Sequence, residues 1–457
     1  MSLPEPISGI TAPKSSFEGE RTIDFRRYHN RLEKIDPITM VGTINKVVGL
    51  VIESQGPPVR IGDLCDVLGE SPSDVSTVEV VGFKAKTVLS MPLGKLQGVR
   101  LGNKIVARNR PASVRVGPNL LGRILDGLGN PIDHLGPIHS EQEYPLHKEP
   151  ENPLSRENIA EPLSTGVRAV DAVLTCGKGQ RVGIFGGSGV GKSTLLGMMA
   201  KYTSADVNVI SLVGERGREL RSFIEKDLGE EGLRRSVVVV STSDNPPLVR
   251  IRAALTATAI AEYFMDQGKN VLLVMDSVTR FAMAQREVGL AAGEPPASKG
   301  YTPSVFAMLP KLLERAGNFH NRGSITGFYT ILVEGDDMND PIADSVRAIL
   351  DGHIVLNREL AARNHYPCID LLDSVSRLFS ELVSPEHRAV AGKLRELLAT
   401  YKKAEDLINI GAYVKGNNPL IDRSIEKIDA INTFLRQKFD ERVTYQAALG
   451  ALTDLFS

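Results

Sequence analysis

The segment from Arg181 to Ser193 constrains this chain more than any other. It reads RVGIFGGSGVGKS, an apolar strand-like run that leads directly into the pattern Gly-x-x-x-x-Gly-Lys-Ser. Glycines at these positions let the backbone turn tightly, so that successive N–H groups point at a bound anion. The residues after Lys192 begin a helix whose positive end faces the same anion. The segment therefore predicts a phosphate-binding loop between a strand and a helix.

The motif also predicts individual roles. Lys192 is expected to reach the β- and γ-phosphates of a nucleotide, and the Ser193 hydroxyl to ligate Mg²⁺. The residues expected around the phosphates are Gly187, Ser188, Gly189, Val190, Gly191, Lys192, Ser193 and Thr194. The alternative, a glycine-rich turn without a ligand, is disfavoured by the flanking strand and helix.

Length and charge limit the class of protein. A chain of 457 residues exceeds what one hydrophobic core normally serves, so two or three domains are expected. The net charge of −1 comes from 54 basic and 55 acidic residues that are well mixed along the sequence. Because no broad basic field is present, a nucleic acid is not the expected partner.

Cysteine usage and hydropathy predict a cytoplasmic protein. Cys65, Cys176 and Cys368 are far apart and outside any metal-ligand spacing, so we expect packed thiols in a reducing compartment. The first thirty residues show no apolar run behind a basic start, and hence no secretory signal. Apolar runs such as 237–240 and 271–275 are strand-sized and too short to cross a bilayer.

The N-terminal region, residues 1–38, is expected to be a flexible segment that contains a short basic amphipathic helix. One face of this helix would carry Phe25, Tyr28 and Leu32, with Arg26, Arg27 and Arg31 largely off it. Two interpretations stay open: the helix caps its own domain, or it contacts a partner or an anionic membrane.

Three further regions follow. Residues 39–108 carry short β-branched runs between Gly and Pro and predict a small β-barrel. Residues 109–384 are expected to form the nucleotide-binding domain, although its first part, 116–165, is rich in turns and predicts a connection over the surface. Residues 385–457 have helical periodicity throughout and predict a helical C-terminal domain.

Within the central region, strands and helices alternate. Apolar strands are predicted at 181–186, 207–214, 236–242 and 270–276, with helices after Lys192, after Arg218 and from about 248. Nearly continuous apolar strands alternating with helices indicate a parallel sheet covered on both faces. The predicted fold class is thus α/β, with a parallel P-loop core between a small barrel and a helical domain.

Two carboxylates are placed to complete a catalytic site. Asp276 ends an apolar strand and would emerge at the carboxyl edge of the sheet beside the loop, where it can hold Mg²⁺ through water. The alternative for Asp276 is a cap on the next helix. Glu215 ends a neighbouring strand in the stretch GERGRE and is placed to polarise the attacking water.

These motifs resemble a known family. The set GGSGVGKST (186–194), GERGRE (214–219), LLVMDSVTRFA (272–282), GEPPASKGYTPSVF (293–306) and LDSVSRL (372–378) resembles the catalytic β-subunits of rotary ATP synthases and their type III protein-export relatives. The match runs from about residue 40 to 445. The stretches 275–317 and 401–416 resemble the export branch, and the phrase RFAMAQRE favours the flagellar export ATPases.

The resemblance implies further roles. It places ATP and Mg²⁺ in the site, with Lys192, Glu215, Arg216 and Arg377 as catalytic residues. Arg377 would act as an arginine finger in the neighbouring subunit's site. Metal contacts would come from Ser193, Asp276 and Glu219, and Tyr366 would stack on adenine. Phe439 and Tyr445 are spaced like the family's second aromatic pair, and their contact with adenine stays open.

The resemblance also implies partners and a location. A homohexameric ring would bind a regulatory stator-like export protein at the N-terminus, and it would work with the export gate and substrate–chaperone complexes. It would lie in the cytoplasm, peripherally on the inner face of the cytoplasmic membrane.

Four alternatives are carried. The first is an ATPase of virulence type III secretion. The second, a rotary ATP synthase catalytic subunit, is weakened because YKKAEDLINIGAYVKGNNPLID stands where its acidic DELSEED stretch would lie. The third, a ring translocase on RNA, predicts base-stacking aromatics, but residues 40–108 hold only Phe83. The fourth, a scaffold that binds nucleotide without hydrolysis, is disfavoured by Glu215.

Overall fold

The computed structural model describes residues 25, 28, 29, 39–71, 74–94, 96, 98–108, 110–140, 142–333, 335 and 337–457. Its contacts divide the chain into two units, Met1–Met40 and Val41–Ser457. In the first unit Phe25 and Tyr28 are exposed and helical, and their ring centroids lie 6.5 Å apart. The rest of the predicted amphipathic helix, including Arg26, Arg27, Arg31 and Leu32, lies outside the described residues.

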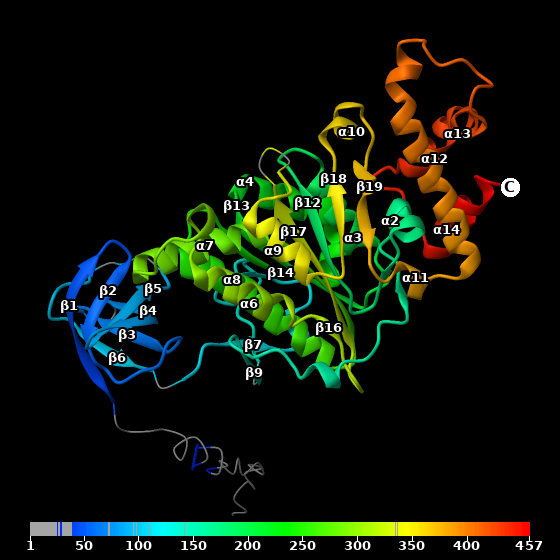
Figure 1. Ribbon diagram of the computed structural model, residues 1–457. Coiled ribbons are helices and arrows are strands. Elements are labelled where there is room, and N and C mark those ends of the chain that lie inside the picture. Colours follow the sequence, from blue (N-terminus) through cyan, green and yellow to red (C-terminus); the bar gives the residue numbers. More distant parts are fainter. Residues whose placement is uncertain are drawn as a thin grey trace, which may run out of the picture. The chain divides into compact units, whose positions relative to one another are not determined.

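The second unit begins with the predicted barrel (Figure 1), which closes in the order β1-β2-β5-β4-β3-β6. Its strands are β1 (Val41–Val48), β2 (Val51–Gln55), β3 (Leu64–Leu68), β4 (Val75–Lys84), β5 (Thr87–Pro92) and β6 (Lys104–Ala107). Inward-facing residues such as Ile44, Ile52 and Ile105 are fully buried. β-Branched residues at alternate positions thus fill the inside of the barrel, as the sequence predicted.

The central sheet has the strand order β19-β18-β12-β17-β15-β13-β14-β8, parallel except for β19. The strands are β8 (Ile124–Asp126), β12 (Arg181–Gly186), β13 (Val207–Glu215), β14 (Ser236–Thr242), β15 (Asn270–Asp276), β17 (Ser324–Leu332), β18 (Gly352–Leu356) and β19 (Ile369–Ser376), and β16 (Gly317–Asn318) pairs with β17. Val209 and Val237 belong to one apolar core, whereas their neighbours Ile210 and Val238 belong to another. Since successive residues of a strand face opposite sides, the sheet is buried on both faces.

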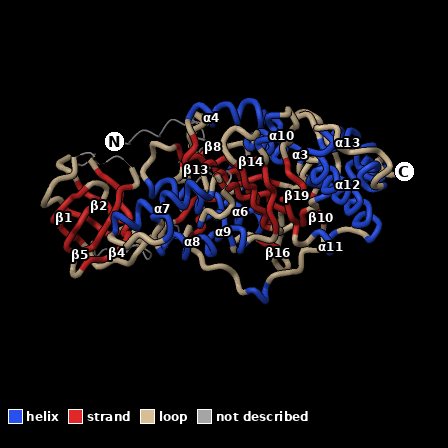
Figure 2. The backbone as a smooth tube through the Cα atoms, turned by 45° about the horizontal axis from the view of Figure 1, so that its top comes forward, coloured by secondary structure: helices blue, strands red, loops and turns tan. Residues whose placement is uncertain are grey.

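Helices cover both faces of this sheet (Figures 1 and 2). The helices of the core are α2 (Arg168–Val173), α3 (Lys192–Tyr202), α4 (Gly217–Ser222), α5 (Gly229–Arg234), α6 (Pro247–Asp266), α7 (Val278–Ala292), α8 (Pro303–Leu313), α9 (Pro341–Ile349), α10 (Arg358–Ala362) and α11 (Phe379–Leu382). A wider π-helical turn, Phe223–Leu228, joins α4 to α5. The helices predicted after Lys192, after Arg218 and from about 248 are confirmed.

The prediction for residues 116–165 was wrong in part, because this stretch joins the core. β8 pairs in parallel with β14 at the sheet edge, and its Leu125 is fully buried. β7 (Ser113–Val116) pairs with β9 (Gln142–Pro145), and β10 (Pro162–Leu163) pairs with β11 (Cys176–Gly177). These strands have only two to four residues each, which is too short for the periodicity to reveal them.

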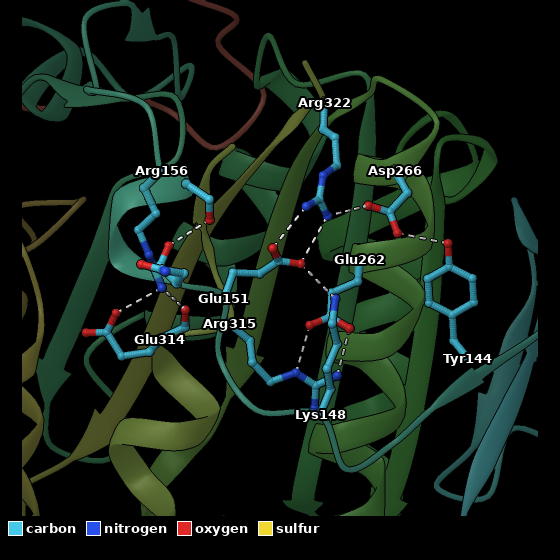
Figure 3. Close-up of polar contacts among 11 residues, drawn as sticks. Tyr144, Lys148, Glu151, Arg156, Glu262, Asp266, Glu314, Arg315 and Arg322 are labelled. Carbon is cyan, nitrogen blue, oxygen red and sulfur yellow. Dashed lines mark hydrogen bonds and ion pairs between the residues drawn. The ribbon is translucent and has the colours of Figure 1, made fainter. Parts of the chain in front are cut away.

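Polar contacts fasten the later part of this stretch to the core (Figure 3). Arg322 forms ion pairs of 3.0 Å with both Glu151 and Asp266, and the Tyr144 hydroxyl donates to Asp266 at 2.9 Å. Below them, Arg315 forms two hydrogen bonds to Glu262, at 2.8 and 2.9 Å, and donates to the Leu146 carbonyl at 2.7 Å. The connection is therefore a fixed part of the fold.

We expect Arg315→Ala to lower the free energy of unfolding by about 3–5 kcal/mol, because the Arg315 and Glu262 side chains are only 2% and 4% exposed and the substitution leaves a buried carboxylate unpaired. Chemical denaturation measures the loss. The control is Arg221→Ala, which removes an exposed pair with Glu225 and should cost less than about 1 kcal/mol. Equal losses of unfolding free energy in the two variants would contradict this account of the Arg315–Glu262 pair.

The C-terminal helical domain consists of α12 (Pro385–Asn409), α13 (Pro419–Leu435) and α14 (Tyr445–Asp454). The predicted helical periodicity is confirmed on α12, where Leu394 and Leu397 are buried while Val390 and Leu398 pack at the edge of the same core. These residues share one apolar core with Leu195 of α3, so the domain packs directly on the nucleotide-binding fold.

Two smaller predictions can also be compared with the structure. Cys65, Cys176 and Cys368 are free and buried, as expected for packed thiols. Among the residues that the structure describes, none of the helices combines the length and the apolar character needed to cross a bilayer.

Candidate active site

The predicted phosphate-binding loop has the expected geometry. β12 ends at Gly186 and α3 begins at Lys192. Gly189 and Gly191 have φ of +82° and +76°, the left-handed region that favours glycine. Gly191 is also the N-cap of α3 and brings no side chain, so the first N–H groups of the helix remain for an anion.

A cavity of about 1140 Å³ opens in front of this loop. Its wall combines loop residues with the end of β13, side chains from α4 and from the N-terminal part of α7, and residues 299, 301, 332, 333, 335, 337 and 340. The charged residues of the wall are Lys192, Glu215, Arg216, Glu219, Arg280, Arg286, Lys299, Asp337, Asp340 and Arg358. The parallel sheet thus presents the carboxyl ends of its strands to one hollow, as α/β folds do at their binding sites.

Lys192 and Asp276 meet at the back of the cavity. Asp276 is buried at the end of β15, where its Oδ1 forms an ion pair with Lys192 Nζ at 2.9 Å and accepts a hydrogen bond from Thr330 Oγ1 at 2.6 Å. The alternative that Asp276 caps α7 does not hold, because the N-cap is Ser277, whose side chain accepts from the Arg280 N–H. The sheet therefore brings the loop lysine and the strand-terminal carboxylate together.

Glu215 lines the same cavity at the end of β13 and is half-buried. Burial raises the pKa of its carboxyl from 4.5 to about 7, and the nearby Asp276 and a hydrogen bond with Glu219 act in the same direction, while Lys192 opposes them. A carboxyl with a pKa near 7 can accept a proton at physiological pH, which suits a general base.

We expect kcat/KM for ATP hydrolysis to fall as the pH is lowered through about 7, because protonated Glu215 no longer accepts a proton from water. An ordinary glutamate would stay ionised down to about 4.5. The pH profile measures this, and ATP binding by Glu215→Gln over the same range controls for titration of the nucleotide. Glu219→Gln should move the inflection to lower pH, and an unchanged inflection would contradict this account of the pKa.

Arg216 and Glu219 lie beside Glu215 on the first turn after β13. Glu219 Oε1 is 3.7 Å from Arg216 and 3.6 Å from Arg218, and all three side chains are substantially exposed. Both Arg216 and Glu219 line the cavity, where a bound phosphate or cation can reach them.

Arg377 lies away from the phosphate-binding loop of its own chain. β19 runs antiparallel to β18, so Ile369 pairs with Leu356 at the loop edge of the sheet and Ser376 pairs with Gly352 near the other end. Arg377 follows Ser376, and its Nη2 donates to the Arg347 carbonyl at 3.1 Å. Arg377 thus does not line the cavity in front of the loop of its own chain.

The three aromatic residues considered for an adenine contact have different surroundings in the structure. The Tyr366 ring packs on the loop, with Cδ1 and Cε1 3.4 Å from the point where a Cβ on Gly191 would stand. The Tyr366 carbonyl accepts from the Gln437 N–H at 3.0 Å, so the segment that carries exposed Phe439 lies beside it. Tyr445 packs instead on the His387 ring, 6.3 Å between centroids, and bonds Thr175. Tyr445 thus belongs to the packing between α12 and α14.

Sequence reasoning missed several cationic residues of the cavity, namely Arg280, Arg286, Lys299 and Arg358. Arg280 lies on the first turn of α7, four residues after Asp276, and its side chain packs against Gly214. Because α7 begins at the carboxyl edge of the sheet, beside the phosphate-binding loop, the position of Arg280 one turn into this helix could have been used to predict that it borders the cavity. Arg358 and Lys299 carried no such signal, because segments distant in sequence bring them to the cavity.

The fold and the site define a P-loop ATPase: a parallel α/β core, a glycine-rich loop with its lysine, and two carboxylates at adjacent strand ends. Comparison with known proteins gives the family. Residues 166–376 match the model of the ATP synthase alpha/beta family nucleotide-binding domain, and residues 383–454 match the T3SS EscN ATPase C-terminal domain. The chain belongs to the ATP synthase alpha/beta family, in the branch of the flagellar and type III secretion ATPases.

Individual relatives cover nearly the whole chain. The flagellum-specific ATP synthase of Bacillus subtilis is 53% identical over 93% of this chain and 97% of its own. The type 3 secretion system ATPase of Xanthomonas euvesicatoria is 50% identical over 91% and 93%. Among solved structures, assembled EscN with its central stalk EscO from enteropathogenic E. coli matches with a TM-score of 0.84 and 45% identity, covering 91% of this chain and all of that one.

Proposed function

We propose that this chain is the ATPase of a flagellar type III export apparatus, and that ATP hydrolysis in the cavity assists the export of flagellar proteins. One observation carries the catalytic part: the Lys192–Asp276 pair and the half-buried Glu215 border the same hollow in front of the phosphate-binding loop. A loop alone can bind nucleotide, whereas a base with a raised pKa beside it supports hydrolysis.

The residues also fit a magnesium ion. Ser193 on the first turn of α3 and Asp276 at the end of β15 flank Lys192, and Glu219 reaches the cavity from α4. Hydroxyl and carboxylate oxygens are the donors that Mg²⁺ takes, together with nucleotide phosphates and water. Bound there, the ion would neutralise charge on the β- and γ-phosphates.

The chain's own residues then act as follows. The N–H groups of 187–194 and Lys192 hold the phosphates, and Tyr366 offers its ring to the adenine, with exposed Phe439 as a second candidate. Glu215 orients the attacking water and takes its proton. Arg216 and an arginine from a neighbour stabilise the charge that develops on the transferred phosphoryl group.

We infer a homohexameric ring with Arg377 as the residue supplied to the neighbour. Two observations support this: Arg377 lies at the sheet edge away from its own loop, and the related EscN was solved as an assembled ATPase with a central stalk. A stalk-like export protein is accordingly a proposed partner. The proposed domain division is 1–38, 39–108, 109–384 and 385–457, and the 1–38 segment would bind a stator-like regulator and an anionic membrane.

A flagellar role is favoured over virulence secretion by the flagellum-specific relative and by the phrase RFAMAQRE on α7. The 50% identity to a type 3 secretion system ATPase keeps secretion of virulence proteins as the second candidate. In either role the ring would sit in the cytoplasm at the inner face of the membrane, with an export gate and substrate–chaperone complexes as partners.

Deletion of the encoding gene in its own organism tests the function. We expect flagellin and hook protein to disappear from the culture medium and to return with the wild-type chain but not with Lys192→Ala. Loss of secreted virulence proteins with normal flagellar export would favour the second candidate instead.

A further inference from the structure

Arg358 is a cationic residue of the cavity that comes from outside the phosphate-binding loop and lies directly against it. A Cβ built on Gly187 would stand 2.4 Å from Arg358 Nη2 and 3.1 Å from its Cζ and Nε. The guanidinium therefore rests on the Gly187 backbone, and the same side chain borders the cavity.

A side chain at 187 would displace the Arg358 guanidinium, whereas the backbone angle at this position does not call for glycine. Gly189 and Gly191 adopt positive φ, whereas Gly187 does not. Around Gly189, by contrast, a Cβ would meet nothing within 4 Å. Gly187 and Arg358 thus form a pair in which the absence of one side chain makes room for the other.

Strand register and anchoring explain why Arg358 reaches this point. Gly186 of β12 pairs with Leu356 of β18. Gly187, which follows β12, therefore lies close to Arg358, which follows β18. Asn357 caps α10 by accepting from the Glu359 N–H, its N–H donates to the Cys368 carbonyl at 2.9 Å, and its side chain donates to Asp370 at 3.1 Å. The base of the Arg358 side chain is therefore held in place.

The hairpin formed by β18, β19 and the connection between them supports the loop at two further points. The Cys368 thiol donates to the Val190 carbonyl at 2.7 Å, and the Tyr366 ring packs on Gly191. Contacts at Gly187, Val190 and Gly191 all come from residues 358–368. The Arg358 contact supports the first turn of the loop, whereas the other two support its second half.

We propose that Arg358 is a positioning residue, which acts through Gly187 to hold the first turn of the loop in its phosphate-binding conformation. The inference rests on the proposed nucleotide site. Because the loop cradles the phosphates shared by ATP and ADP, both should lose affinity when the support is removed. The Nη2, Cζ and Nε atoms of the guanidinium make the contact, and lysine has no such planar group, so it is not an equivalent replacement.

The test measures the Kd of ATP and ADP, together with kcat and KM, for the full chain. We expect Arg358→Ala to raise both Kd values about tenfold and to change kcat less than KM, since Lys192 and Glu215 stay in place. Arg358→Lys should fail to restore affinity. Gly187→Ala should give a similar loss by displacing the guanidinium, and the double variant should be no more than about twofold weaker than the weaker single one.

The matched control is Arg363→Ala on the same hairpin, because exposed Arg363 pairs with Glu405 at 2.8 Å and does not border the cavity. Thermal midpoints without nucleotide show whether each variant folds, and Arg358→Gln, which keeps a planar end, replaces Arg358→Ala if that variant does not. The inference would be overturned if Arg358→Ala left the Kd values unchanged. It would also be overturned if the effects of Arg358→Ala and Gly187→Ala multiplied to about a hundredfold in the double variant. A loss of affinity confined to ATP and restored by Arg358→Lys would overturn it as well. Wild-type chain without nucleotide affinity would overturn the proposed site itself.

Discussion

Glu215→Gln is expected to lower the rate of ATP hydrolysis at least about a hundredfold while leaving nucleotide affinity nearly unchanged. The glutamine amide can still hydrogen-bond in the cavity, but it has no basicity with which to take a proton from water. The raised pKa of Glu215, caused first by burial and then by Asp276, supports our proposal that this carboxyl is the base. Steady-state turnover and the Kd of a fluorescent ATP analogue measure the two effects.

Glu225→Gln is the matched control for this substitution. Glu225 lies in the π-helical turn after α4, pairs with Arg221 in solvent and does not border the cavity. This variant should hydrolyse ATP like the wild type. Wild-type turnover in Glu215→Gln would remove Glu215 from the mechanism, and the base would have to be sought elsewhere in the cavity.

Arg377→Ala is expected to abolish the rate that depends on assembly, by about a thousandfold, with ATP binding retained. Lys192→Ala should be inactive for a different reason, because its own loop cannot hold the phosphates. When the two variants are mixed in one ring, a Lys192→Ala subunit can still supply its arginine to an Arg377→Ala neighbour. In random rings about a quarter of the sites would then be complete.

The expected result of mixing is therefore recovery of activity from two inactive chains. Labelled subunits and energy transfer show whether mixed rings form, and a chain carrying both substitutions, mixed with either parent, is the control that should recover nothing. Mixed rings without activity would contradict the assignment of Arg377 to the neighbour's site.

Most of the fold was predictable because the pattern of apolar residues along the sequence indicates its strands and helices. The strands 181–186, 207–214, 236–242 and 270–276 are nearly continuous apolar runs, as a sheet buried on both faces requires. β8 escaped because its three residues lie among turn residues, and only pairing with β14 shows that they are a strand. β17 and β18 were not assigned either, since their glycines and polar residues, as in SITGFYTIL, break the apolar run.

The site divides in the same way. Lys192, Glu215 and Asp276 follow from local patterns, because each stands at the end of a strand or the start of a helix at one sheet edge. Arg358 and Lys299 reach the cavity through pairings between distant segments, and a single sequence does not show such pairings. For Tyr445 the resemblance left an adenine contact open, and the structure places its ring beside His387.

The central claim is that assembly completes the active site, and the ATPase rate per subunit as a function of protein concentration tests it most directly. Particle mass is measured in the same samples by light scattering. We predict a steep rise in the rate per subunit that follows the population of rings, and no such rise for Arg377→Ala. A rate per subunit that stays constant while the particle mass increases to that of a ring would contradict the account.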